Sequence, residues 1–272
     1  MHERERHTLI LDAVADRPVV TVAEAAALTG ASEATARRDI AALHLEGKLR
    51  RVRGGAEAVG PRQPGGSTVP GGIRIPSFAQ SMNVATDAKR AIADRAVATC
   101  EDGEAIIVNG GTTTFHMVHA LAGRRLSVMT NSFPIAEVLL RASRCTVTIP
   151  GGTVYRDQQV ILSPFDQDAT QTFAARRMFM GAQGIGPLGV MEVDPVIVRA
   201  EQKLIGQAEE LVVMLTSDKL TRRAPLICCP LERVHTVITD SGIGAPEREM
   251  LEGAGVRLEI VEVDASTGEV AA

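Results

Sequence analysis

The stretch that decides the fold of the first part of the chain is TVAEAAALTGASEATARRDIAALHLEGKLRRVRGGA, residues 21–56. Its pattern predicts two short helices joined by a tight turn, followed by a basic hairpin. Ser32 stands where its hydroxyl can cap the second helix by accepting a hydrogen bond from a free backbone N–H. An apolar stripe at helical spacing predicts which face of that helix is buried, and it consists of Ala36, Ile40 and Leu43.

The opposite face of the second helix is polar and basic. Thr35, Arg37 and Arg38 project away from the apolar stripe, and basic residues follow at positions 48, 50, 51 and 53. A helix that buries one face and offers Arg and Thr on the other, beside a cationic hairpin, suits a DNA major groove and its phosphates. We therefore expect contact with double-stranded DNA from Ser32, Thr35, Arg37, Arg38, Lys48, Arg51 and Arg53.

The flanking residues complete a small helical unit. Residues 3–16 predict a first helix that Pro18 ends, Thr21 and Glu24 have the spacing of a capping box, and Gly30 supplies the turn. Together these features predict a winged helix-turn-helix over residues 1–57. A small helical domain of another purpose is the alternative, and the coincidence of the basic wing with the exposed arginines disfavours it. We expect inward-facing side chains at Leu9, Ile10, Ala13, Val14, Val22, Ala25, Ala26 and Leu28.

Length and composition limit the classes of protein. A chain of 272 residues with 45% hydrophobic content has room for two domains. The net charge of −4 means that positive charge for DNA must be local, and it clusters between positions 37 and 53. No apolar run is long enough to span a membrane, and the N-terminus lacks a signal-peptide core, so we expect a cytoplasmic protein. Buried, reduced thiols are expected at Cys100, Cys145, Cys228 and Cys229.

Residues 58–77 have a different composition from either flank. Prolines alternate there with glycines, and little is available to bury. We expect a linker, partly extended by its prolines, that lets the DNA-binding head reorient. Such a tether suits a dimer whose heads must reach two half-sites.

From residue 78 to residue 272 the pattern becomes α/β. Helical patterns at 87–100, 134–141 and 201–209 alternate with short apolar runs that read as strands. This alternation predicts a mainly parallel sheet covered by helices on both faces. We expect strands at 105–108, 126–129, 145–149, 177–180, 211–215, 234–239 and 256–261.

Small polar or glycine clusters follow four of these strands, at 109–114, 130–132, 150–152 and 216–219. In an open α/β sheet, ligands bind outside the carboxyl ends of the strands. The first cluster, NGGTTT, offers two glycines, three hydroxyls and a helix start, which together suit a phosphate. It lacks the lysine of an ATP-binding P-loop, so we expect no nucleotide cofactor.

Other candidate sites carry less weight. His116 and His119 lie three positions apart on a helix, but no third ligand is near in sequence, so we expect no metal. Glu201 and Lys203 fit a solvated, charged helix face better than a site. For Tyr155, contact with the ligand and ordinary packing are equally compatible with the sequence.

The residues of both halves resemble one family. Ser32, Thr35, the run RRDI at 37–40, Gly47, Leu49, Arg51 and the run GGA at 54–56 resemble the DNA-binding head of the DeoR family of bacterial transcriptional regulators. The second half resembles that family's sensor domain at 110–114, 130–132, 151–152, Gly181 and Lys219. Ala36 and Arg53 stand where Ile or Val, and His, are usual in the family.

The resemblance implies a fold and a ligand. The sensor domain of the family is related in fold to ribose-5-phosphate isomerase and the CoA transferases, and it typically binds phosphorylated sugars. By that analogy the threonine loop holds the phosphate, while Asn131 and Lys219 contact the sugar. The implied effector site consists of Asn109, Gly110, Gly111, Thr112, Thr113, Thr114, Asn131, Ser132, Gly151, Gly152, Gly181 and Lys219.

Two departures from the family pattern bear on the ligand. Asn109 stands where Asp is common, and residues 216–219 read TSDK in place of DSSK, which moves the carboxylate by two positions. The segments LSP at 162–164 and AEQK at 200–203 resemble the sugar-catabolism subgroup of the family.

The sequence therefore predicts a cytoplasmic, DNA-binding repressor of a carbohydrate catabolic operon. We expect a dimer or tetramer that binds operator DNA and releases it when a phosphorylated sugar binds, without catalytic residues or a cofactor. The alternative is an isomerase-like enzyme with an appended DNA-binding head, which needs a carboxylate base. Asp218 is the only acid in the four clusters, which disfavours that alternative. A purely structural oligomerisation domain is the third possibility.

Overall fold

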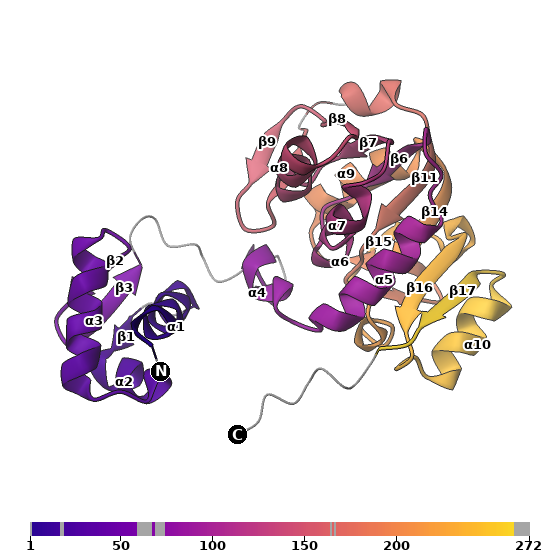
Figure 1. Ribbon diagram of the computed structural model, residues 1–272. Coiled ribbons are helices and arrows are strands. Elements are labelled where there is room, and N and C mark those ends of the chain that lie inside the picture. The colour runs from indigo at the N-terminus through magenta and orange to yellow at the C-terminus, as the bar shows by residue number, and fades with distance from the viewer. Residues whose placement is uncertain are drawn as a thin grey trace. The chain divides into compact units, whose positions relative to one another are not determined.

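A computed structural model describes residues 2–16, 19–58, 67–68, 74–163, 165 and 167–263. The chain divides into two compact units, Met1–Gly66 and Ser67–Ala272 (Figure 1). The boundaries predicted at 57/58 and 77/78 stay predictions. Within the predicted linker, strand β4 (Ser67–Thr68) pairs antiparallel with β5 (Arg74–Ile75). Residues 59–66 and 69–73, which hold its glycines and all of its prolines except Pro76, lie outside the described residues.

The first unit is the predicted winged helix-turn-helix. Three helices precede the wing, and a short strand between the first two completes a three-stranded antiparallel sheet in the order β1-β3-β2. The elements are α1 (Glu3–Asp16), β1 (Val20–Thr21), α2 (Val22–Thr29), α3 (Glu33–Leu45), β2 (Leu49–Val52) and β3 (Gly55–Ala58).

Local chemistry explains where these helices begin and end. Thr21 and Glu24 form the predicted capping box, and Gly30 ends α2 with φ +61°, a region that favours glycine. The predicted core stripe of α3 is confirmed, since its three residues are at most 1% exposed. The inward predictions for Leu9 and Leu28 are wrong, since these side chains are 39% and 44% exposed. On α2, Thr29 takes the buried position and donates its hydroxyl proton to the Ala25 carbonyl at 2.7 Å.

The second unit is built on a seven-stranded sheet in the order β17-β16-β14-β11-β6-β7-β8 (Figure 1). Every neighbouring pair is parallel, which confirms the predicted parallel α/β architecture. The strands are β6 (Ala105–Val108), β7 (Ser127–Thr130), β8 (Thr146–Thr148), β11 (Ala175–Met180), β14 (Ala208–Met214), β16 (Thr236–Asp240) and β17 (Arg257–Val261).

Both faces of the central strands are buried. Ile106 and Phe179 belong to a core on one face, with side chains of α5 and α8, whereas Ile107 and Met178 belong to a core on the other, with α9. A strand buried on both faces reads as a continuous apolar run, which is why these strands were readable in the sequence. The helices of this unit are α4 (Phe78–Met82), α5 (Thr86–Ala98), α6 (Thr112–Phe115), α7 (Met117–Leu121), α8 (Phe133–Ala142), α9 (Pro195–Ile205) and α10 (Ala245–Gly253).

Several elements differ from the sequence prediction. The helix expected at 201–209 is α9, which ends before Gly206, and β14 begins at Ala208 because it pairs with β11 from that residue. Short antiparallel strands were not predicted, because three or four residues give too little periodicity. One pair is β9 (Thr153–Tyr155) with β10 (Val160–Leu162), and a three-stranded sheet consists of β12 (Gly184–Gly186), β13 (Gly189–Glu192) and β15 (Leu226–Cys229). Short 3-10 turns occupy Ala169–Thr172, Ser217–Lys219 and Leu231–Arg233.

Two sequence-based expectations concern the chain as a whole. Cys100, Cys228 and Cys229 are buried free thiols as expected, and Cys145 is a free thiol that is only half-buried. Among the described helices, none is both long and apolar enough to cross a membrane.

Candidate functional site

The outer surface of α3 presents the two arginines that the sequence singled out. Arg37 and Arg38 are exposed, and Arg37 pairs with Glu33 one turn earlier at 2.6 Å. The Ser32 hydroxyl accepts the Thr35 amide hydrogen at 3.2 Å and lies 3.0 Å from the Thr35 hydroxyl. These two hydroxyl residues thus fix the start of α3, while the guanidinium groups stay at the surface.

The wing adds further basic side chains beside α3. Arg51 and Arg53 are exposed and, together with Arg37, line a groove of about 520 Å³ between α3 and the β2–β3 turn. Lys48 pairs with Glu46, and Arg50 pairs with Glu57. Within the described ranges, Arg38, Arg51 and Arg53 have no carboxylate partner, so their guanidinium groups are available to phosphates and base edges.

A buried ion pair holds α3 against α1. Asp39 is 5% exposed and accepts two hydrogen bonds from the Arg6 guanidinium, at 2.7 and 3.0 Å, with the His7 ring 3.5 Å away. The hydrogen bonds from Arg6 lower the pKa of Asp39. Sequence reasoning quoted Asp39 within the family motif but gave it no role, because its partner lies 33 residues earlier.

The second unit has a cavity of about 240 Å³ at the carboxyl ends of four adjacent strands, β14, β11, β6 and β7. Residues from each strand end reach it, as expected for an open α/β sheet. Of the twelve residues predicted to bind an effector, seven line this cavity: Gly110, Gly111, Thr112, Thr113, Asn131, Gly181 and Lys219.

The other five predicted residues lie outside the lining. Asn109 is 1% exposed; its side-chain NH2 group donates to Glu201 at 2.9 Å and its side-chain oxygen accepts from the Gly181 amide at 3.1 Å. The Thr114 hydroxyl donates to the backbone carbonyl of Asn109 at 2.8 Å, and Ser132 caps α8. Gly151 and Gly152 lie in the turn between β8 and β9, outside the cavity lining.

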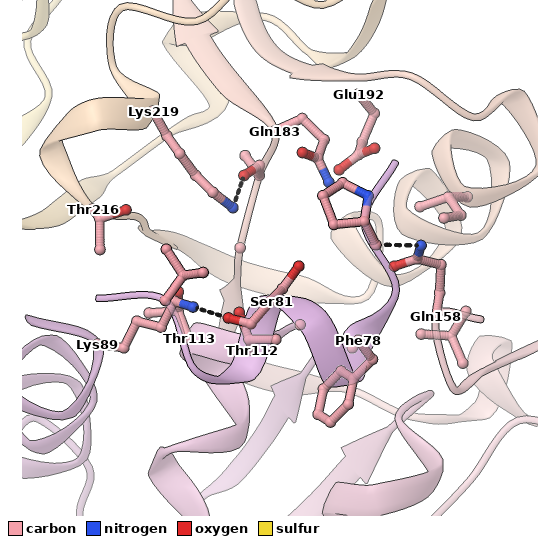
Figure 2. Close-up of a pocket in the computed structure, with 18 of the residues that line it drawn as sticks. Phe78, Ser81, Lys89, Thr112, Thr113, Gln158, Gln183, Glu192, Thr216 and Lys219 are labelled. Carbon is pink, nitrogen blue, oxygen red and sulfur yellow. Dashed lines mark hydrogen bonds between the residues drawn. The ribbon is translucent and has the colours of Figure 1, made fainter. Parts of the chain in front are cut away.

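The glycine-threonine loop at 110–113 is shaped by close contacts. The Gly110 amide donates to the Asn131 side chain at 2.8 Å, and a Cβ at Gly110 would stand 2.2 Å from a Val160 methyl carbon. The first amides of α6 have no acceptor within the helix, and the side chains of Thr112 and Thr113 face the cavity (Figure 2). The loop therefore offers hydroxyls and amides to an anion.

Replacing Thr113 with valine is expected to weaken binding of a phosphorylated ligand by about 1–2 kcal/mol, because one hydroxyl donor is lost while the shape is kept. Isothermal titration calorimetry of both proteins with the same ligand measures this. Thr99→Val is the matched control, because the Thr99 hydroxyl bonds the Ala96 carbonyl at 2.7 Å away from the cavity. Equal affinities for wild type and Thr113→Val would remove Thr113 from the site.

Two lysines place positive charge in the cavity. Lys89, on α5, is 3% exposed and donates to the Ser81 carbonyl at 2.5 Å; Lys219 donates to the Ala182 carbonyl at 3.0 Å (Figure 2). Burial, and then the charge of Lys219, lowers the pKa of Lys89 to about 8, and burial also lowers the pKa of Lys219. Each ammonium has donors beyond its one carbonyl, and an anion between them relieves their repulsion.

Residues 76–85, here called the wall segment, form one side of the same cavity. The segment contains α4 and directly follows the paired strands of the predicted linker. The Gln158 side chain donates to the Pro76 carbonyl at 3.2 Å, and Ala85 ends the segment with φ +51°, which non-glycine residues seldom adopt. The wall segment is thus held to the sheet domain at several points around the cavity.

The cavity also holds two buried acids: Glu192, which sequence reasoning missed, and Glu201, which it assigned to a solvated helix face. Glu192, at the end of β13, is 5% exposed, and burial raises its pKa to about 7. Glu201 is 3% exposed, so the predicted solvated face is wrong for it, and burial together with Glu192 raises its pKa well above the usual range. Asp218, the only acid in the four predicted clusters, also lines the cavity, and its exposed side chain pairs with Arg222.

The remaining residues weighed in the sequence are also located. Lys203 is half-buried and pairs with Asp168 at 3.0 Å, so the prediction of a solvated side chain is wrong for it too. His116 is buried, whereas His119 is exposed, and the described residues contain no group of three or more potential metal ligands. Tyr155 is 39% exposed and does not line the cavity.

An exposed arginine face on a winged helix-turn-helix, in one chain with a cation-lined cavity in an α/β domain, defines a ligand-responsive DNA-binding regulator. Family models agree with both halves: the DeoR-like helix-turn-helix domain matches residues 6–62, and the DeoR C terminal sensor domain matches residues 84–241. The chain belongs to the DeoR family of transcriptional regulators.

Curated relatives cover nearly the whole chain. The HTH-type transcriptional regulator UlaR from Shigella dysenteriae serotype 1 (strain Sd197) is 31% identical over 95% of this chain and 99% of its own length. UlaR from Escherichia coli (strain K12 / DH10B) matches to the same extent. Among solved structures, ribose 5-phosphate isomerase A from Methanocaldococcus jannaschii matches 50% of this chain and 55% of its own at 15% identity and a TM-score of 0.37. The eIF2B delta subunit from Chaetomium thermophilum matches 51% of this chain and 50% of its own, at 15% identity and a TM-score of 0.37.

Proposed function

We propose that this regulator represses a carbohydrate catabolic operon and that a phosphorylated sugar relieves the repression. The observation that carries the proposal is the cavity in which two lysines meet a loop of hydroxyls and free amides. Two ammonium groups that line one cavity favour a dianion such as a phosphate monoester. Polar side chains elsewhere in the lining fit the hydroxyls of a sugar, and a cavity of about 240 Å³ suits a small metabolite.

We also propose the setting in which the protein acts. It works in the cytoplasm as a dimer or tetramer, so that two heads engage two half-sites of an operator. The predicted division into a head at 1–57, a linker at 58–77 and a sensor at 78–272 belongs to the same proposal. Effector binding changes operator affinity only if the effector has different affinities for two states of the protein.

A two-stage experiment tests this function. Melting temperature is first measured against a panel of three- to six-carbon sugar phosphates and their unphosphorylated counterparts. Any hit is then added to a gel-shift assay with the DNA upstream of the gene. Stabilisation by phosphorylated compounds alone, with release of DNA, is the expected result. If a compound stabilises the protein but strengthens its DNA binding, the effector acts as a corepressor or the protein as an activator, and relief of repression is wrong. If no sugar phosphate raises the melting temperature, the proposed class of effector is wrong.

Replacing Arg38 with alanine is expected to weaken operator binding by about 1–3 kcal/mol, because an unpaired guanidinium leaves the DNA-facing helix. Fluorescence anisotropy with the upstream DNA measures the loss, and calorimetry checks that effector affinity is unchanged. Arg90→Ala is the matched control, because Arg90 is an exposed arginine of the sensor unit. Unchanged DNA affinity in Arg38→Ala would refute the assignment.

An enzyme remains a second candidate because of Glu192. A carboxyl with a pKa of about 7 that lines a cavity beside two lysines has the properties of a general base for sugar-phosphate isomerisation. We propose that the protein is not an enzyme, since its curated relatives are named as transcriptional regulators. Incubation with each stabilising sugar phosphate, followed by chromatography, separates the two. Recovery of an isomer with wild type but not with Glu192→Gln would establish catalysis.

A further inference from the structure

The effector cavity has two ends of opposite charge. Lys89 lies at the glycine-threonine loop, whereas Glu192 lies beside Gln183, away from Lys89 (Figure 2). The chain holds this acidic end together, since the Gln183 amide donates to the Met191 carbonyl at 3.1 Å. A ligand whose phosphate sits at the loop therefore extends its other end toward a carboxyl group.

The groups around Glu192 determine what it can accept. Its own β-strand and the following turn bring Asp194, α9 brings Glu201, and the turn after β14 brings Lys219. The Val193 amide donates to one Glu192 carboxyl oxygen at 3.1 Å. A carboxylate has about four acceptor sites, so this contact leaves capacity for hydroxyl hydrogens.

Glu201 does not compete for the same role. Its two carboxyl oxygens are occupied by the Asn109 side-chain amide at 2.9 Å and by the Cys228 thiol at 2.9 Å. Glu201 also lines the cavity, but both of its oxygens are already engaged, and its raised pKa favours the neutral form, so it adds little negative charge there. Glu192 therefore remains the acid of this end with free acceptor capacity.

We propose that Glu192 binds the hydroxyls at the unphosphorylated end of the effector, so that the sensor accepts phosphate monoesters ending in neutral hydroxyls and rejects those ending in a carboxylate or a second phosphate. This inference rests on the proposed sugar-phosphate function. It narrows the effector to aldose, ketose or polyol monophosphates. Selection here comes from repulsion of the wrong ligand as much as from attraction of the right one.

Pairs of ligands that differ only at the far end test the inference. The pairs are glycerol 3-phosphate with 3-phosphoglycerate, erythritol 4-phosphate with erythronate 4-phosphate, ribitol 5-phosphate with ribonate 5-phosphate, and glucitol 6-phosphate with gluconate 6-phosphate. Calorimetry on the full chain at pH 8 is expected to give roughly tenfold or greater preference for the polyol in any pair that binds. Glu192→Gln should bring that preference close to one.

A second readout keeps the test independent of the variant's folding. Lowering the pH from 8 to 6 adds a proton to Glu192, whose pKa is about 7, so the preference should shrink in the wild type as well. Titration of the ligand phosphate and of Lys89 affects both members of a pair and cancels in the ratio. The control Glu249→Gln, an exposed glutamate on α10, should leave the preference unchanged.

The outcomes separate the inference from the function on which it rests. If both members of a pair bind equally, or the acid binds more tightly, the role of Glu192 is wrong although the phosphate site stands. A preference that persists in Glu192→Gln and at pH 6 also contradicts that role. If no member of any pair binds, the sugar-phosphate function fails, and this inference fails with it.

Discussion

Replacing Lys219 with methionine is expected to weaken binding of the phosphorylated effector about a hundredfold, because a charge partner is removed from a site shielded from water. Methionine keeps most of the length and apolar volume of the side chain, so packing around the 3-10 turn changes little. Lys89 alone then balances the phosphate, and its repulsion by Lys219 is gone. Calorimetry with a stabilising sugar phosphate measures the loss.

A surface charge provides the matched control for this substitution. Arg141→Met removes a positive charge from α8 at a side chain that is 77% exposed, outside the cavity. It should change effector affinity by less than the experimental error. If Lys219→Met binds the effector as tightly as wild type, the phosphate does not sit between the two lysines.

The same pair of lysines gives effector binding a pH dependence. Because the pKa of Lys89 is lowered to about 8, this ammonium loses its proton as the pH rises through that value. An anion favours the protonated form, so affinity is expected to fall between about pH 7 and pH 9 in the wild type. The decline should be smaller in Lys89→Met. A flat profile in the wild type would mean that the anion does not contact Lys89.

Replacing Asp39 with alanine is expected to destabilise the DNA-binding head by about 2 kcal/mol and to lower its melting temperature by roughly 10 °C. Asp39 is buried and accepts two hydrogen bonds from the Arg6 guanidinium, so the variant loses an ion pair between α1 and α3, whose apolar packing remains. Operator affinity should fall with the folded fraction of the head. Circular dichroism and anisotropy at rising temperature follow both quantities.

The pH dependence of this effect has a definite sign. The folded pKa of Asp39 is lowered, so its stabilisation is fully present above the unfolded value of about 4 and is lost as the pH falls through the folded value. The difference between wild type and variant should therefore shrink below about pH 4. Asp12→Ala, at an exposed position of α1, is the control. Equal melting temperatures for wild type and Asp39→Ala at pH 7 would contradict the role of the pair.

Local signals explain what the sequence revealed of the fold. Capping residues at Thr21 and Ser32 and the apolar stripe on α3 depend on neighbours within a few positions, so they were readable without a structure. The same holds for β6, whose predicted bounds, 105–108, match the structure. The short antiparallel strands gave no such signal, and one of them, β13, carries Glu192 to the cavity.

The candidate site was predictable only in part, and for a related reason. The loop at 110–113 is recognisable from its glycines and threonines. Lys89 and Glu192 have no distinctive sequence neighbours, and only the fold brings them to the same cavity. Asn109 shows the opposite error: its place beside the glycines implied ligand contact, but its side chain joins β6 to α9. Contacts between residues tens of positions apart cannot be recovered from spacing along one chain.

The bond between Lys89 and the Ser81 carbonyl sets up a competition. A ligand that shifts this ammonium as it binds the remaining hydrogens weakens the bond to the wall segment, so for such a ligand effector affinity and the anchoring of that segment oppose each other. We therefore expect a substitution that loosens the wall segment without contacting the ligand to raise the affinity for the effector. In the same variant, a smaller fraction of the ligand-free protein would occupy a single state.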